Sequence, residues 1–171
     1  MFATLVAFVA LLPTPQEPGG PSPAEIAALK KLNFLVGKWE GTGWVQQGPN
    51  RQEFTGTEHV QTKLQGKALL VEGLFRENVS KKVFHETLAV ITFDEKTNKY
   101  TFATYLFNRP NGNFELKLLD NGFSWQMKPN DAVTVDYTMK LEKGEWVEIG
   151  EVLMPNQQKM KFLEMRLKKV Q

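Results

Sequence analysis

Apolar and polar side chains alternate with a period of two over most of this chain, and this pattern constrains the fold more than any other feature. In one segment Val133, Val135 and Tyr137 share one face of an extended strand. Thr134 and Asp136 then point to the opposite face. The links between such segments are too short for the crossover that parallel strands require. The sequence therefore predicts consecutive antiparallel strands.

Ten such segments are expected, and the links between them carry turn chemistry. Asn121-Gly122 is the strongest hairpin signal, because both residues tolerate the positive φ of a two-residue turn, and Lys143-Gly144 is a weaker one. A sheet this long leaves two unpaired edges unless it closes on itself. We therefore predict an all-β fold, a single closed antiparallel up-and-down β-barrel with one short N-terminal helix; a two-sheet sandwich is the alternative. The expected strands cover residues 38–47, 51–64, 68–76, 83–93, 99–107, 112–119, 122–128, 132–141, 145–154 and 160–170.

The N-terminal residues differ in composition from the rest of the chain. Residues 1–12 carry no charge and are apolar apart from one threonine; they are too short to span a bilayer but match the apolar core of a signal peptide. Residues 13–24 hold five prolines and two glycines, which is typical of a flexible tether. We expect export to the periplasm or the extracellular space, with an unprocessed apolar tail as the alternative. The expected division is a signal peptide over residues 1–15, a tether over 16–24 and a barrel domain over 25–171.

A short helix is expected where the tether ends. Ser22 is a suitable N-cap, Pro23 suits the first helical position, and Glu25 can complete a capping box. Ile26 and Leu29 then share one helical face. A helix this small needs a surface to lie on, and an open end of the barrel would provide one.

Composition and charge limit the classes of partner and site. The net charge is +2 and no basic run is present, so nucleic acid is not an expected partner. The chain has no cysteine, which excludes disulfides and thiolate metal sites. His59 shares a polar face with Glu53 and Gln61, whereas His85 shares a face with Ile91 and is the better lumen candidate. Two histidines on separate strands do not predict a metal site.

Residues 35–43 read Leu-Val-Gly-Lys-Trp-Glu-Gly-Thr-Gly and follow the expected helix. This segment resembles the Gly-x-Trp signature of the calycin barrels, the lipocalin-like superfamily. Its longer form, Gly-x-Trp-x-Gly-x-Gly with a Leu-x-Gly lead-in, more closely resembles the nitrobindin-like haem-binding barrels and related uncharacterised bacterial lipocalin-like proteins. Residues 162–170 also resemble the closing strand of that group. We expect the glycines to let a coiled strand pass close to its neighbours, and Trp39 to plug the floor of the lumen.

The resemblance raises the question of haem. In nitrobindins a histidine on the final strand ligates the haem iron from inside the barrel, and by resemblance that position falls at or near Phe162. Phenylalanine has no axial donor atom, and no histidine follows His85. Met160 and Met165 lie nearby, but methionines on an apolar strand are expected to pack. We therefore expect no cofactor, and haem is disfavoured.

The lumen of such a barrel is expected to be lined mainly by aromatic side chains. Three glutamates also stand out because they lie among apolar neighbours, and a buried carboxylate must find a partner or be neutral. We hypothesise a polar cluster within or at the rim of the lumen formed by Glu72, Glu86, Glu164 and Arg166; outward-facing glutamates in surface ion pairs are the alternative. The expected ligand-binding residues are Trp39, Phe54, Phe75, His85, Tyr105, Phe107, Trp125 and Phe162.

No catalytic motif is present in the sequence. Glycines 41 and 43 lie within a strand, so they do not form a phosphate loop, and no Gly-x-Ser-x-Gly elbow occurs. The sequence is therefore interpreted as a non-enzymatic, exported barrel that holds a small, partly apolar molecule. The alternatives are an enzyme that uses the carboxylate cluster, a degenerate haem isomerase of nitrobindin type, and a barrel with a filled lumen that serves as an interaction module.

Overall fold

The structure is a computed structural model. The described residues are 20, 22–131, 133–154 and 158–170. The expected signal peptide and most of the expected tether lie outside them. Within the described part of the chain, no helix has the length and apolar character needed to cross a membrane.

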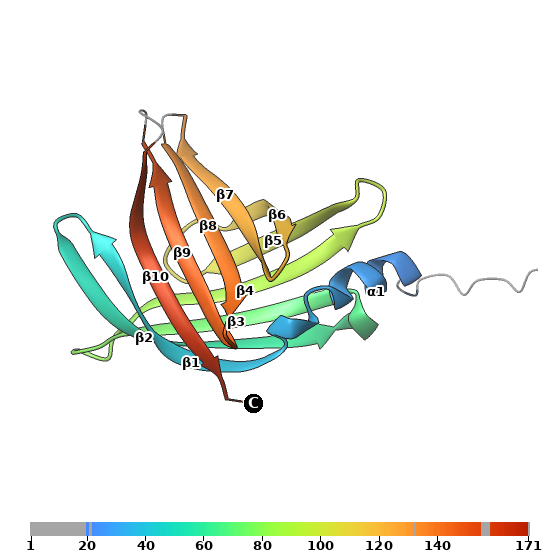
Figure 1. The fold of residues 1–171 in the computed structure, drawn as a ribbon, viewed down its shortest axis with the longest axis horizontal. Helices are drawn as coiled ribbons and strands as arrows, with labels where there is room; N and C mark the ends of the chain where they lie inside the picture. The colour runs from blue at the N-terminus through green and yellow to red at the C-terminus, as the bar shows by residue number, and fades with distance from the viewer. Residues whose placement is uncertain (1–19, 21, 132, 155–157, 171) are drawn as a thin grey trace, which may run out of the picture.

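Ten antiparallel strands close into one barrel (Figure 1). Each strand pairs with its neighbours in the sequence, and the first pairs with the last. The predicted closed up-and-down barrel is confirmed, and the sandwich alternative is wrong. Each strand lies within a residue or two of its predicted position. The strands are β1 (Gly37–Gln47), β2 (Asn50–Lys63), β3 (Ala68–Glu77), β4 (Val83–Asp94), β5 (Lys99–Leu106), β6 (Gly112–Leu119), β7 (Gly122–Asn130), β8 (Val133–Glu142), β9 (Glu145–Leu153) and β10 (Lys159–Lys169).

The predicted helix is present as α1 (Pro23–Lys30) and begins with the predicted capping box. The Ser22 hydroxyl accepts a hydrogen bond from the Glu25 backbone N–H at 3.1 Å, and the Glu25 carboxylate accepts one from the Ser22 backbone N–H at 3.0 Å. A 3-10 turn, η1 (Asn33–Leu35), follows and leads into β1. The capping box therefore fixes where the tether ends and the folded domain starts.

α1 and η1 cover one end of the barrel (Figure 1). Leu29 and Leu35 are buried in the barrel core there. The Tyr100 hydroxyl donates a hydrogen bond to the carbonyl of Ala28 at 2.9 Å, and the Trp39 indole N–H donates one to the carbonyl of Leu35 at 2.7 Å. These contacts close this end of the barrel, which we call the closed end. The hairpins β1–β2, β3–β4, β5–β6, β7–β8 and β9–β10 surround the opposite, open end.

The hairpins form where predicted, but the turn chemistry differs between them. Lys143 and Gly144 both have positive φ, as a primed two-residue turn requires. Asn121 and Gly122 do not, so the conformation predicted for that pair is wrong. Asn121 lies in the turn and Gly122 is the first residue of β7, where a Cβ would lie 1.9 Å from the carbonyl oxygen of Met139. Glycine is needed there for the close approach of β8 and not for turn conformation.

The glycines of β1 let that strand pass close to its neighbours, as predicted. A Cβ at Gly41 would lie 2.0 Å from the backbone oxygen of Arg166 in β10. A Cβ at Gly43 would lie 2.4 Å from the ring of Phe54 in β2. The first strand therefore gives up side-chain volume at the seam where the barrel closes.

Candidate functional site

The barrel encloses a cavity of about 550 Å³ that all ten strands line. Leu35 lies at its closed end, and Arg109, Pro110 and Asn111 of the β5–β6 link lie at its open end. Bulges bring consecutive residues to the cavity at two points. The register shift of β10 against β9 lets both Phe162 and Leu163 reach the cavity, and a shift of β3 against β4 goes with the inward placement of both Phe84 and His85.

Aromatic rings form much of the cavity wall. The rings of Trp125 and Tyr137 stack with centroids 4.7 Å apart. Phe102 meets Trp125 edge-on at 5.2 Å, and Phe162 meets Tyr137 edge-on at 5.8 Å. This arrangement gives a rigid apolar surface that faces inward.

Five of the eight residues predicted from the sequence to contact a ligand line the cavity. They come from β2, β3, β4, β7 and β10, so the topology brings together side chains that are far apart in the sequence. These residues are Phe54, Phe75, His85, Trp125 and Phe162.

The other three do not line the cavity, so their predicted placement is wrong. Tyr105 is 48% exposed, and Phe107, which follows the last residue of β5, is 62% exposed. The even-numbered residues Phe102, Thr104 and Leu106 occupy the inward face instead. Trp39 is buried beneath the floor, where its ring meets Trp146 edge-on at 5.8 Å. At the closed end, Trp146 lines the cavity in place of Trp39.

The predicted polar cluster also does not form within the lumen. Glu72, Glu86 and Arg166 are exposed, and Glu164 is half-buried. Because side chains alternate along a strand, the buried Met165 faces the cavity, and Glu164 and Arg166 on either side of it point outward. Apolar neighbours on both sides of a glutamate do not identify the inner face of this barrel.

The outward-facing glutamates make ordinary surface contacts. The Arg166 guanidinium lies 3.1 Å and the Lys161 ammonium 3.0 Å from the Glu164 carboxylate. The Glu72 carboxylate accepts a hydrogen bond from the Gln61 side chain at 2.9 Å. These contacts fit the alternative of surface ion pairs.

Two carboxyl groups in the cavity were missed by the sequence analysis. Glu58 of β2 is 8% exposed, and Glu148 of β9 is partly buried with its free surface facing the cavity. Both lie toward the closed end, since Glu58 pairs with Trp39 across the β1–β2 ladder and Glu148 follows Trp146 by two residues. The signal that could have identified Glu58 is its position on the same face as Phe54.

Contacts around the two carboxyls differ. The Trp146 indole N–H donates a hydrogen bond to Oε2 of Glu148 at 3.3 Å. Oε2 of Glu58 is buried and has no hydrogen-bond partner among the described residues. A Cβ at Gly73, the β3 partner of Glu58, would lie 2.8 Å from Oε1 of Glu58. The missing side chain at Gly73 thus leaves room for the Glu58 carboxyl.

Burial perturbs the titration of these carboxyls. Burial raises the pKa of Glu148 to about 7, and the hydrogen bond from Trp146 opposes only part of this rise. Burial also raises the pKa of Glu58 well above its usual range, and the charge of Glu148 adds to this effect. The two groups therefore interact, and near neutral pH the pair retains at least one proton.

The other titratable groups of the lumen are neutral except at its open end. Burial, with a contribution from Arg109, lowers the pKa of His85 to about 4, so its imidazole is uncharged near neutral pH. Its Nε2 atom lies 2.6 Å from Oγ1 of Thr87. Burial raises the pKa of Tyr137 to about 12, so its phenol keeps its proton. Negative charge can therefore develop at the closed end, while Arg109 places positive charge at the open end.

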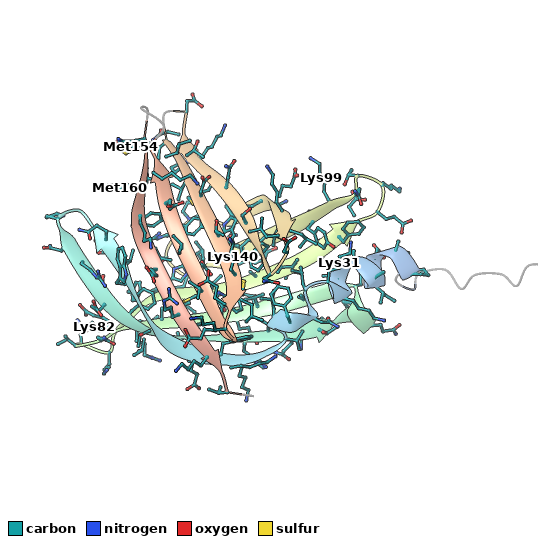
Figure 2. All side chains as sticks on the ribbon, in the orientation of Figure 1. Lys31, Lys82, Lys99, Lys140, Met154 and Met160 are labelled. Carbon is teal, nitrogen blue, oxygen red and sulfur yellow. The ribbon has the colours of Figure 1, made fainter. Side chains whose placement is uncertain are left out.

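The residues present do not fit the haem site that the nitrobindin resemblance implies. Phe162 lies on the cavity wall and supplies no donor atom to iron. Met160, which is labelled in Figure 2, is 51% exposed and does not line the cavity, and Met165 is buried in the core. Within the described ranges, no three His, Asp or Glu side chains lie close enough together to hold a metal ion.

Comparisons with known proteins bear on the fold. No protein-family model matches the chain. No curated protein matches it either. The structure is similar to the crystal structure of Rv2717c from M. tuberculosis, with a TM-score of 0.62 and 12% sequence identity over 84% of this chain and 98% of that chain. At this identity the similarity shows the fold alone; it is compatible with a calycin-like barrel and does not extend to a nitrobindin-like assignment.

Proposed function

We propose that the barrel binds a small, largely apolar molecule in its lumen and catalyses no reaction on it. The enclosed cavity of about 550 Å³ carries this proposal. Small-molecule sites are typically concave, measure about 300–1,000 Å³, and combine an apolar lining with a few polar groups. The aromatic wall and the small set of polar side chains in this lumen match that description. A filled lumen, which the interaction-module alternative requires, is not supported by a cavity of this size.

A tryptophan at position 87 is expected to compete with the ligand for space. Thr87 lines the cavity, so Thr87→Trp should weaken binding of the fluorescent apolar probe 1-pyrenemethanol by about tenfold or more. The matched control is Leu88→Trp, because Leu88 is the next residue on β4 and is 43% exposed. Fluorescence titration measures both affinities, and far-UV circular dichroism checks that both variants fold. Equal affinities for the two variants, or no saturable binding to the unmodified protein, would contradict the proposal.

We also propose that the protein is exported, on the composition of residues 1–15. A signal peptide is removed on export, so protein isolated from its source should begin near residue 16. N-terminal sequencing measures this directly. A chain that still carries residues 1–12 would argue against export.

A further inference from the structure

We propose that the molecule bound in the lumen carries a cationic amine group, which is held between Glu58 and Glu148 at the closed end. This inference rests on the proposed function and adds the chemical class of the ligand. The amine would lie at the base of the cavity, and the apolar body of the ligand would extend along the aromatic wall toward the open end.

The unsatisfied oxygen of Glu58 is the first observation. This side chain is 8% exposed and lines the cavity, and its Oε2 atom has no hydrogen-bond partner among the described residues. A buried acceptor that is left unpaired destabilises the folded protein. Gly73 leaves room for this carboxyl, because a Cβ there would lie 2.8 Å from Oε1 of Glu58. A ligand donor that enters the cavity can supply the missing hydrogen bond.

The second carboxyl specifies what kind of donor fits. Glu148 also lines the cavity and is close enough to Glu58 to interact with it electrostatically. Ionised carboxylates only accept hydrogen bonds, and an ammonium group offers three donors and no acceptor. The empty pair retains at least one proton near neutral pH, and a cation between the two carboxyls favours their ionised forms. An amine therefore satisfies both the hydrogen-bonding capacity and the charge of the pair.

The distribution of charge along the lumen gives the orientation of the ligand. Titratable or charged side chains that face this space are Glu58, Glu148, Tyr137, His85 and Arg109. Tyr137 and His85 are uncharged near neutral pH, for the reasons given above. Among the described residues that line the cavity, the carboxyl pair is then the one group available to hold a cation, whereas the Arg109 guanidinium at the open end disfavours one. An anionic ligand would instead be drawn to Arg109.

Three probes that share one apolar body test the inference. 1-Pyrenemethylamine is cationic, 1-pyrenemethanol is neutral and 1-pyrenecarboxylate is anionic. Near pH 8, above the pKa of about 7 for Glu148, we expect the amine to bind the full-length protein about tenfold tighter than the alcohol. Lowering the pH to about 5.5 should weaken binding of the amine and leave the alcohol unchanged, because the pair becomes protonated.

Variants of the two carboxyls separate recognition of the amine from binding of the apolar body in the cavity. Glu58→Gln and Glu148→Gln should remove the preference for the amine and retain binding of the alcohol. Glu164→Gln, an outward-facing carboxyl, is the matched control and should keep the full preference.

The outcomes distinguish the inference from the proposed function. If no probe binds the unmodified protein, the proposed function fails and the inference fails with it. If the alcohol binds as tightly as the amine, or the preference persists in both variants, only the inference fails. Tighter binding of the carboxylate probe would overturn the inference and direct attention to Arg109.

Discussion

A Gly41→Ala variant is expected to lose about 3 kcal/mol or more of unfolding free energy. The added Cβ would lie 2.0 Å from the backbone oxygen of Arg166 and 2.9 Å from the Cα of Leu167. Backbone atoms cannot rotate away as a side chain can, so β1 and β10 must separate at this point. These two strands form the seam that closes the barrel, and their separation also breaks ladder hydrogen bonds. Chemical denaturation followed by tryptophan fluorescence measures the loss.

Gly56→Ala is the matched comparison for this variant. Gly56 of β2 is the register partner of Gly41, and its added Cβ would meet the ring of Phe75 at 2.4 Å. That ring borders the cavity and has space to move, so the expected loss is smaller. A Gly56→Ala variant as unstable as Gly41→Ala, or a Gly41→Ala variant as stable as the unmodified protein, would contradict a backbone contact at the seam.

The sequence predicted the fold well because the evidence for it is local. Period-two alternation, short links and turn residues locate each strand, and the need to pair every edge then closes the sheet. The capping box at Ser22 located the start of α1 within one residue for the same reason. The prediction for the conformation of one turn failed because it left out contact with a strand outside that hairpin. Gly122 was interpreted as a turn glycine, but the approach of β8 explains it better.

The faces of the strands were harder to predict than the strands themselves. β5 carries aromatic residues on both faces, with Tyr100 and Phe102 inward and Tyr105 outward, so aromatic character alone cannot assign the lumen side. Exposed aromatic residues are common because much of any protein surface is apolar. The bulge in β10 adds to this difficulty, since it brings the consecutive residues Phe162 and Leu163 to the same cavity.

Glu58 was missed because glutamates were selected by their apolar neighbours in the sequence, and Glu58 lies between Thr57 and His59. Glu58 lies on the same face as Phe54 and Val60, both of which are fully buried, so the alternation within β2 did contain its position. Nothing in the sequence reveals that Glu148 lies close to it, because β2 and β9 are not adjacent strands. Their proximity follows from closure of the barrel.

Replacing Glu148 with glutamine is expected to stabilise the protein by about 3 kcal/mol near pH 8 and to have little effect near pH 4. The pKa of this carboxyl is raised from 4.5 to about 7 in the folded state. Below about pH 4.5, the pKa of this carboxyl in the unfolded chain, both the folded and the unfolded state hold the proton, so no stability is lost. As pH rises from about 4.5 to 7, the unfolded state releases its proton and the folded state does not, so unfolding becomes easier. Glutamine mimics the protonated side chain and removes this dependence.

Comparing the variant with the unmodified protein at each pH isolates Glu148 from the other titrating groups. The pKa of His85 is lowered from 6.5 to about 4 in the folded state. The stability that depends on the neutral imidazole is therefore present above about pH 6.5 and is lost as the pH falls to 4. This trend is opposite to the one from Glu148. That contribution is common to both proteins and cancels in the difference. Removal of the Glu148 charge also lowers the pKa of Glu58, and this acts in the same direction as the main effect.

The pH dependence of the difference, and not its size at one pH, decides the interpretation. A stabilisation that grows between about pH 5 and 8 identifies a carboxyl that is held away from water, whereas a constant one would indicate better packing of the amide. Glu164→Gln should instead destabilise the protein as the pH rises, because hydrogen bonds from Lys161 and Arg166 stabilise the charged Glu164 and lower its pKa. If both variants respond alike, Glu148 is not desolvated. A carboxyl that destabilises the empty barrel as it ionises is, for the same physical reason, the group that gains most from an amine in the lumen.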